Sequence, residues 1–128
     1  MSTRTYVQGG VLDASRVRRI RRDLLTPEAA HEVSETFSML GDATRTRILQ
    51  ALSLEELCVS DLSALLEVSQ SAASHQLRML RDRRLVAVRR EGRHTFYRLR
   101  DEHIRTLVDM GVSHAAEENG GPRRRSPR

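Results

Sequence analysis

The sequence has no lysine and no tryptophan, one cysteine, two tyrosines and two phenylalanines. A single cysteine, Cys58, excludes an intrachain disulfide framework. So few aromatic rings argue against a protein that binds single-stranded nucleic acid by stacking bases on them. No apolar run approaches the ~20 residues of a membrane-spanning helix, and residues 1–10 lack the apolar core of a secretory signal. We therefore expect a cytoplasmic protein with no membrane partner.

Since lysine is absent, all 22 basic residues are arginine, and the net charge is +5. The planar guanidinium group binds phosphate and guanine through paired hydrogen bonds, which makes double-stranded DNA the first partner to consider. Charge alone is weak evidence, because a basic surface can simply be solvated. The length of 128 residues fits one domain. No small organic substrate is expected.

Composition divides the chain into three segments. We expect an N-terminal arm and basic helix in residues 1–25, a central domain in 26–118, and a disordered basic tail in 119–128. Within the first segment, apolar residues recur at helical spacing on an arginine-rich background, which predicts a short helix over 13–25. Its arginine-rich part, residues 16–22, fits packing on a dimer or contact with DNA, and the sequence leaves both open.

The central segment begins with two predicted helices. Thr26-Pro27 is a typical helix start, with a capping hydroxyl followed by proline at the first helical position. Gly41 ends this helix, and the next is predicted over residues 43–53. The expected inward-facing residues are Ala30, Val33, Phe37 and Leu40 in the first helix, and Ile48, Leu49 and Leu52 in the second.

Two short helices follow, joined by a tight turn after Val68. Ser60 and Ser69 are their expected N-cap residues, since a serine hydroxyl satisfies a free backbone N–H at a helix start. The second helix is polar and carries arginine, so the pair has the pattern of a helix-turn-helix. The expected buried residues are Leu62, Leu65 and Leu66 in the first helix, and Ala73, Leu77 and Leu80 in the second.

A β-hairpin is predicted next. Residues 85–90 and 94–100 favour strands, and Glu91-Gly92-Arg93 between them supplies a glycine for the turn. A final helix is predicted over residues 101–118. This order of elements predicts a winged helix-turn-helix, mainly α with a small β-hairpin, in which the hairpin is the wing.

The final helix carries two histidines and two carboxylates, a donor set that suits zinc in a tetrahedral site. His103 and His114 lie about 16 Å apart along one helix, at a rise of about 1.5 Å per residue. Metal–ligand bonds of about 2.0–2.2 Å cannot span that separation. If the four side chains share an ion, they must come from two antiparallel copies of the helix, and a two-fold dimer then has two equal sites. The alternative is a solvated polar flank with two incidental histidines.

Each such site takes Asp101 and His103 from one chain and His114 and Glu117 from the other. At about 100° per residue, the last three fall within about 60° of one another around the helix. Asp101 need not share that face, because an N-cap residue has a non-helical backbone. We expect a homodimer through its N- and C-terminal helices. The expected seam on the last helix is the apolar stripe Ile104, Leu107, Val108, Gly111 and Ala115.

Contacts with DNA follow from the fold. The second helix of a helix-turn-helix places its N-terminal residues against base edges, while a wing contacts phosphates or the minor groove. For Ser69 the alternative is a pure cap, and for His75 a partly packed side chain. The expected DNA-contacting residues are Ser69, Gln70, Ser71, Ser74, His75 and Arg78 on the helix, and Arg89, Arg90 and Arg93 around the wing turn.

Residues 28–118 closely resemble the ArsR/SmtB family of metal-sensing bacterial repressors. The resemblance rests on the segments FSMLGDATRTRILQAL, ELCVSDLSALLEVSQSAASHQLRMLRDRRLV and RREGRHTFYRLRDEHI. In the SmtB-like zinc sensors of that family, the pattern D-x-H, ten residues, H-x-x-E or H-x-x-H binds metal across the dimer. Asp101, His103, His114 and Glu117 match this pattern. The resemblance implies an apo dimer that binds a palindromic operator and that zinc releases, which derepresses metal-homeostasis genes.

The family's second type of metal site uses paired cysteines in the pattern E-L-C-V-C-D-L. Here Ser60 replaces the second cysteine, so Cys58 and Asp61 alone are too few ligands for a tight site. The alternative, which we favour, is that Cys58 is a small buried residue and Asp61 a first-turn helix acid. The C-terminal donors admit zinc, cobalt or nickel. Cadmium or copper(I) at Cys58 is the thiol alternative.

Three other functions compete with a zinc-responsive repressor. A repressor of the same family could respond instead to thiol chemistry at Cys58 or to a thiophilic metal. A zinc enzyme is less favoured, because catalytic zinc keeps an open position for water and four protein ligands leave none. A metal-storage protein would need neither a helix-turn-helix nor a basic wing.

Overall fold

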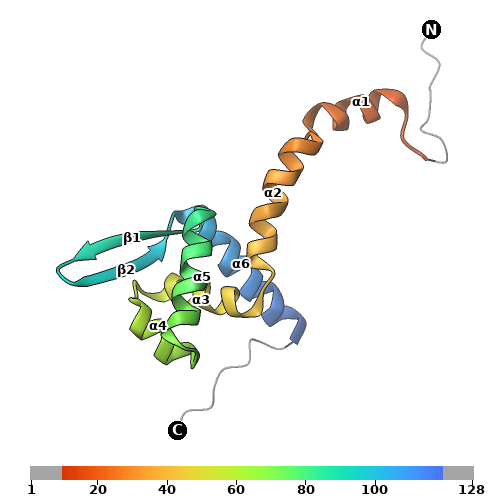
Figure 1. The fold of residues 1–128 in the computed structure, drawn as a ribbon. Coiled ribbons are helices and arrows are strands. Elements are labelled where there is room, and N and C mark those ends of the chain that lie inside the picture. The colour runs from red at the N-terminus through yellow and green to blue at the C-terminus, as the bar shows by residue number, and fades with distance from the viewer. Residues whose placement is uncertain (1–9, 120–128) are drawn as a thin grey trace. The chain divides into compact units, whose positions relative to one another are not determined.

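The computed structural model describes residues 10–119 of the chain. Six helices and two strands occur in that range (Figure 1). The predicted arm before residue 10 and the predicted tail after residue 119 lie outside the described residues. In chain order the elements are α1 (Ala14–Asp23), α2 (Pro27–Leu40), α3 (Ala43–Leu54), α4 (Val59–Leu66), α5 (Gln70–Asp82), β1 (Val86–Glu91), β2 (His94–Leu99) and α6 (Glu102–Asn119).

The chain divides into two compact units, residues 1–35 and 36–128. In the first unit, the Asp13 carboxylate caps α1 by accepting a backbone N–H at 2.9 Å. Thr26 Oγ1 accepts the N–H of Ala29 at 3.1 Å, which confirms the predicted start of α2. No residue of α1 is buried. The apolar side of α1 is therefore not part of a hydrophobic core among the described residues.

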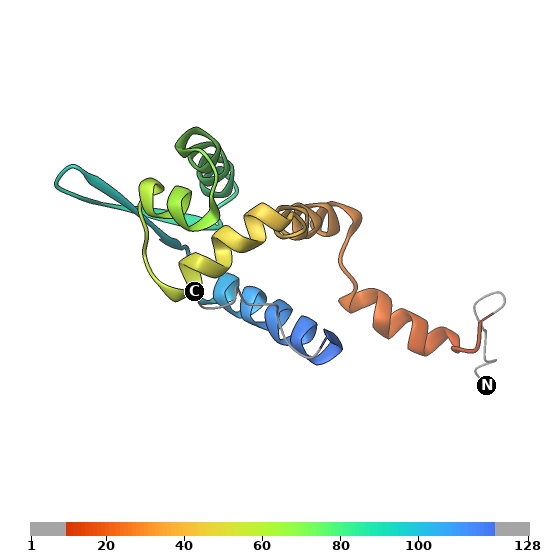
Figure 2. The same cartoon turned by 90° about the horizontal axis from the view of Figure 1, so that it is seen from below.

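The second unit is built around one hydrophobic core. Helices α3, α4 and α5, the base of the hairpin and α6 all contribute side chains to it. The start of α6 lies next to the end of α3, and the two helices diverge from there (Figure 2). The predicted burial of the apolar faces of α3 and α5 is confirmed. None of the helices in residues 10–119 is long and apolar enough to cross a membrane. The core residues are Met39, Ile48, Leu49, Leu52, Leu62, Leu66, Leu77, Leu80, Leu85, Val86, Leu99, Ile104 and Val108.

Several residues predicted to be buried are exposed instead. Val33 and Phe37 on α2 are 40% and 55% exposed, and Ala30 is also exposed. Met39 is the buried residue of α2. On α4, Leu65 is 53% exposed, because it lies about 100° around the helix from Leu66 and so on the flank of the buried face. The prediction of an inward face was therefore wrong for these positions within one chain.

The start of α4 also differs from the prediction. Ser60 is not the N-cap, because the helix begins at Val59 and Cys58 takes the capping position. The carboxylate of Asp61 accepts the backbone N–H of Cys58 at 3.4 Å and so satisfies a group that the helix leaves free. Asp61 is thus a first-turn acid, as predicted.

The turn between α4 and α5 has well-defined polar contacts. Glu67 ends α4 in a left-handed conformation with φ of 58°. Ser63 Oγ donates to the carbonyl of Val68 at 2.6 Å, and Ser69 Oγ accepts the N–H of Ala72 at 3.0 Å. The predicted Ser69 cap is confirmed. Helices α4 and α5 therefore form the predicted helix-turn-helix.

The hairpin pairs β1 and β2 antiparallel, from Val86 opposite Leu99 to Glu91 opposite His94. Gly92 in the turn has φ of +59°, a conformation that favours glycine. Two features hold the base of the hairpin in place. Val86 and Leu99 are buried there, and Tyr97 exchanges backbone hydrogen bonds of 2.8 and 3.1 Å with Leu57, in the segment before α4. These elements make the second unit a winged helix-turn-helix, mainly α with a small hairpin, as predicted.

We expect Leu77→Ala to lower the free energy of unfolding by about 2–5 kcal/mol, because it opens a cavity at a fully buried position. Leu54→Ala is the matched control. Leu54 is 74% exposed, so the same substitution there should change stability by no more than about 0.5 kcal/mol. Chemical denaturation followed by circular dichroism measures both, and equal losses would contradict this description of the core.

Candidate metal site and DNA-recognition surface

Helix α5 has one buried face and one exposed face. Ala73, Leu77 and Leu80 lie in the core, which fixes the helix against the rest of the second unit. The opposite face carries hydroxyl, amide, imidazole and guanidinium groups, which are the side chains that bond base edges in the major groove. Of the residues predicted there, Ser69, Gln70, Ser71, His75 and Arg78 are exposed and Ser74 is half-buried.

The imidazole of His75 is exposed, so the alternative of a partly packed side chain does not hold in one chain. Ser69 serves as the α5 cap and is exposed at the same time. A capping hydroxyl at a helix start lies beside free backbone N–H groups, which suit a phosphate oxygen. The exposed face of α5 therefore offers both base-edge and phosphate donors.

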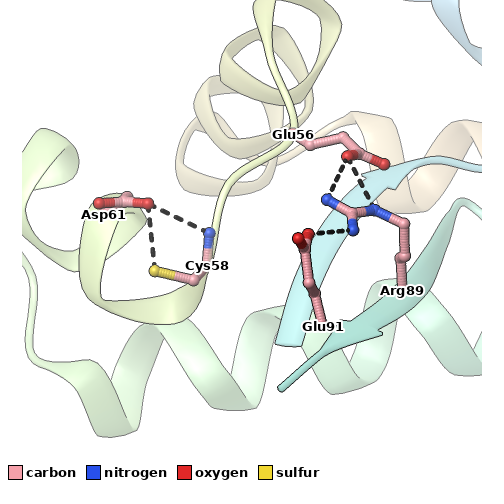
Figure 3. A network of polar contacts seen from close by, with 5 residues as sticks. All are labelled: Glu56, Cys58, Asp61, Arg89 and Glu91. Atoms are coloured by element: carbon pink, nitrogen blue, oxygen red, sulfur yellow. Dashed lines mark hydrogen bonds and ion pairs between the residues drawn. The ribbon is translucent and has the colours of Figure 1, made fainter. Parts of the chain in front are cut away.

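Arg89 on β1 has partners that sequence reasoning missed (Figure 3). Its Nε and Nη2 donate to Glu56 Oε2 at 3.1 and 3.0 Å, and its Nη1 donates to Glu91 Oε2 at 2.6 Å. The guanidinium also lies 4.8 Å from the centre of the Phe96 ring, in cation–π geometry. Glu91 is two residues away on the same strand face, which the alternation of a strand could have predicted. Glu56 is distant in sequence, and no sequence pattern links it to Arg89.

These contacts change the acid–base properties of the wing. Hydrogen bonds to Glu91 and then Glu56 raise the pKa of Arg89, and the hydrogen bond from Arg89 lowers the pKa of Glu91. Both shifts favour the charged forms of Arg89 and Glu91, which therefore compensate each other. Arg90 and Arg93, by contrast, are exposed and have no ion-pair partner in residues 10–119. The wing thus presents Arg90 and Arg93 near its turn, and Arg98 on β2, without an ion-pair partner in residues 10–119, whereas the carboxylates of Glu56 and Glu91 hold Arg89.

Asp101 lies immediately before α6 and caps it. Its Oδ1 accepts the N–H of Ile104 at 3.1 Å, which confirms that it stands outside the helix as an N-cap. The same oxygen lies 3.5 Å from Nδ1 of His103, whose side chain is 93% exposed. One carboxylate and one imidazole are thus adjacent at the start of α6, open to solvent.

His114 and Glu117 form a second pair, nearer the end of α6, and both are exposed. They are three residues apart, which places them as neighbours on the helix surface. Within residues 10–119 of a single chain, no group of three or more His, Cys, Asp or Glu side chains is arranged to hold a metal ion. One chain therefore has two separate pairs of candidate metal ligands, each made of one imidazole and one carboxylate.

The stripe between the two pairs is apolar. Leu107 and Met110 are 36% and 66% exposed, and they lie on the same face of α6 as the histidines. His103, Leu107, Met110, His114 and Glu117 follow one another at spacings of four, three, four and three, and so fall within a sector of about 80°. Ile104 and Val108, predicted to belong to the seam, are buried in the chain's own core instead. The exposed stripe is therefore Leu107 and Met110, with a donor pair at each end.

Cys58 is a free, half-buried thiol, less buried than the favoured alternative predicts. Its Sγ lies 3.1 Å from Oδ2 of Asp61 (Figure 3). Both residues are engaged in the N-terminal cap of α4. The contact is a local structural one, and the pair supplies only two donors.

The geometry agrees with the comparisons with known proteins. The family model described as "Bacterial regulatory protein, arsR family" matches residues 42–88, which run from the start of α3 into β1. The chain is 43% identical to a "Transcriptional repressor SmtB homolog" of Synechocystis over 80% of this chain and 78% of that protein. It is 39% identical to a "Cadmium resistance transcriptional regulatory protein CadC homolog" of Staphylococcus aureus, over 80% and 84%.

Among solved structures, the fold is similar to that of the AntR antimony-specific transcriptional repressor. The TM-score is 0.69 and the identity 35%, over 76% of this chain and 88% of that chain. These relatives are regulators of transcription, not enzymes. The chain therefore belongs to the ArsR family of bacterial regulatory proteins, the metal-responsive transcriptional repressors.

Proposed function

We propose that this protein is a zinc-responsive repressor whose homodimer binds operator DNA until metal, bound between two copies of α6, lowers its DNA affinity. Cobalt and nickel are the alternatives that the same donors admit. The observation that carries the proposal is the exposed stripe of α6, which has Leu107 and Met110 at its centre and a nitrogen–oxygen donor pair at each end.

The stripe defines how two copies of α6 would pair. Its spacing of four and three residues is the repeat with which one helix packs along another. His103 precedes Leu107 by four residues, and Met110 precedes His114 by four. An antiparallel register that places Leu107 against the partner's Met110 therefore also places His103 against the partner's His114. The apolar contact and the metal contact require the same register, which supports both.

Each end of this seam would hold one ion. Asp101 and His103 of one chain and His114 and Glu117 of the other supply two imidazoles and two carboxylates, as in a closed tetrahedral zinc site. An apolar groove runs beside the seam, lined by residues of α2, α3 and α6, and would receive side chains of the partner. Exposed apolar residues of α1 and α2, among them Ile20 and Phe37, would complete the dimer.

The structure offers a route by which the metal end of α6 could affect the rest of the unit. Arg105, two residues after His103, donates to the backbone carbonyl of Ser53 near the end of α3. A shift of α6 on metal binding would therefore move the end of α3. Helix α3 packs in the same core as α5, so the position of α5 would change as well. Thermodynamic linkage requires metal to bind free dimer more tightly than DNA-bound dimer, by the factor with which it weakens DNA binding.

In the metal-free dimer, α5 of each subunit would enter a major groove through Gln70, Ser71, Ser74, His75 and Arg78. Ser69, Arg90 and Arg93 would bind phosphates. A two-fold dimer matches an imperfect palindrome with half-sites about one helical turn apart, or a multiple. Arg89 differs from the other predicted DNA contacts, because its carboxylate partners assign it to holding the wing.

A thiol-based response at Cys58 is less well supported. It would use cadmium or copper(I), yet the only other donor beside the thiol is Asp61, and both residues cap α4. Among the relatives, the CadC homolog is named for cadmium and AntR for antimony. The choice of zinc for this chain rests on the nitrogen and oxygen donors of α6.

We expect zinc to weaken operator binding by roughly 5- to 150-fold, the usual range of such couplings. The probe is a duplex selected from a random-sequence pool by repeated binding to metal-free protein, and fluorescence anisotropy measures affinity with and without zinc. His103→Ala/His114→Ala should bind the duplex normally and lose the zinc effect. His31→Ala, an exposed histidine outside the site, is the control and should keep it. Equal affinity with and without zinc in the unmodified protein would rule out the sensor.

A mixed dimer tests whether the ligands cross the seam. One subunit carries Asp101→Ala/His103→Ala, and its partner, with a different affinity tag, carries His114→Ala/Glu117→Ala. One site then loses all four ligands, while the other keeps all four and should bind one zinc ion per mixed dimer. Homodimers of either variant keep only half of each site and should bind none tightly. A mixed dimer without tight zinc would contradict shared sites, and so would a homodimer of either variant that retains it.

The wing can be tested by the salt dependence of DNA affinity. We expect Arg93→Gln to make the slope of log affinity against log salt shallower by about 1 for each phosphate that the variant no longer binds. Arg89→Gln/Glu56→Gln is the matched control, because it removes an ion pair without changing net charge and should leave the slope unchanged. The reverse result would mean that Arg89, and not Arg93, contacts the backbone.

A further inference from the structure

Helix α1 is the most strongly charged element of the described chain. It contains five arginines in ten residues, with no acidic residue in its first turn. The Asp13 carboxylate beside it is already engaged, since it accepts the Ser15 hydroxyl and a backbone N–H, both at 2.9 Å. All five guanidinium groups are exposed, and none has an ion-pair partner in residues 10–119. The arginines are Arg16, Arg18, Arg19, Arg21 and Arg22.

The arginines are arranged on the helix rather than scattered. Ser15, Arg18, Arg21 and Arg22 line one shallow groove along α1, as expected for residues three and four apart. Val17, Ile20 and Leu24 lie within about 60° of one another on another side. Ile20 is 50% exposed, so this apolar side is available to a protein surface while the groove side is available to an anion.

We infer that the arginine groove of α1 is a second DNA-binding surface, which contacts phosphates outside the base pairs that α5 reads. The inference rests on the proposed function, because α5 and the wing bring the operator to the protein. It assigns α1 a role that the helix-turn-helix does not fill. The apolar side of α1 remains for the dimer, so the inference assigns the two expectations for residues 16–22 to different sides of one helix.

Length and charge favour a nucleic acid backbone as the occupant. A helix of ten residues is about 15 Å long, which matches roughly four phosphates at 3.4 Å of axial rise per strand. Guanidinium groups bind phosphate with two parallel hydrogen bonds. Once α5 has bound, α1 is tethered to the same DNA, so even weak phosphate contacts would form at a high effective concentration. A basic amphipathic helix can also lie on an anionic membrane, and the test separates the two.

The test compares two duplexes and three proteins. One duplex is the selected operator trimmed to its half-sites, and the other extends it by about one helical turn, roughly 10 base pairs, on each side. The proteins are the unmodified full chain, Arg18→Gln/Arg21→Gln/Arg22→Gln, and Arg18→Lys/Arg21→Lys/Arg22→Lys. The lysine variant keeps the charge and serves as the matched control. Affinity is measured across a range of salt concentrations.

The unmodified protein should bind the longer duplex more tightly and with a steeper dependence of log affinity on log salt. The slope should steepen by about 0.9 for each additional phosphate bound, hence by up to roughly 5 for the six arginines of a dimer. The glutamine variant should lose this gain and bind the trimmed duplex as the unmodified protein does. The lysine variant should retain most of the steeper slope. Sedimentation checks that all three remain dimers of equal size.

Two results would overturn the inference. The first is an equal slope for the unmodified protein on both duplexes. The second is a glutamine variant that still binds the longer duplex more tightly than the trimmed one. If that variant has also lost the binding of vesicles of phosphatidylserine and phosphatidylcholine that the unmodified protein shows, α1 is assigned to a membrane surface. Failure of the proposed function gives a different result, because the unmodified protein would then show no sequence preference on the trimmed duplex.

Discussion

The rest of the structure depends on the burial of one face of α5. Leu77 and Leu80 are fully enclosed, and they hold the helix against α4 and β1 in the core that α3 shares. Because that face is fixed, the opposite face has a defined direction and a defined distance from the wing. The core therefore acts as the frame that converts a polar helix into a surface able to recognise a sequence.

The wing depends on the same frame and adds its own constraint. The strand ends at its base, Val86 and Leu99, are buried, and Tyr97 joins it to the segment before α4. Arg89 then joins Glu56 on that segment to Glu91 on the strand. The Arg89 contacts are exposed and contribute little stability each. Their value is geometric, since they hold the hairpin beside the helix-turn-helix while leaving Arg90 and Arg93 unpaired.

Much of the fold could be predicted because its signals are local. The Ser69 cap, the glycine turn of the hairpin and the buried stripe of α5 all depend on residues a few positions apart. Prediction failed where the deciding partner was distant in sequence, or where the residue is left uncovered by its own chain. Glu56 is 33 residues from Arg89, and no periodicity connects them. Phe37 looked like a core residue because the sequence marks it as apolar without saying which chain covers it.

The candidate metal site follows the same division. The four proposed ligands and their separation along the helix come from the sequence alone, and the structure places them as two exposed pairs. The sequence could not show that the predicted apolar stripe is divided. Ile104 and Val108 are buried in their own chain's core, while Leu107 remains on the surface. Tertiary packing decides between these neighbours: of the predicted seam it buries Ile104 and Val108 and leaves Leu107, Gly111 and Ala115 exposed.

The N-cap at Asp101 limits how this carboxylate can bind a cation. Oδ1 is committed to the first turn of α6, where it satisfies the N–H of Ile104. A metal that needs one oxygen can use Oδ2 and leave the helix start intact. A large cation that prefers both oxygens of a carboxylate, as calcium does, would have to uncap the helix first. In the proposed site, the first turn of α6 would thus favour ions that accept a single carboxylate oxygen, and part of the metal selectivity would lie in a backbone hydrogen bond.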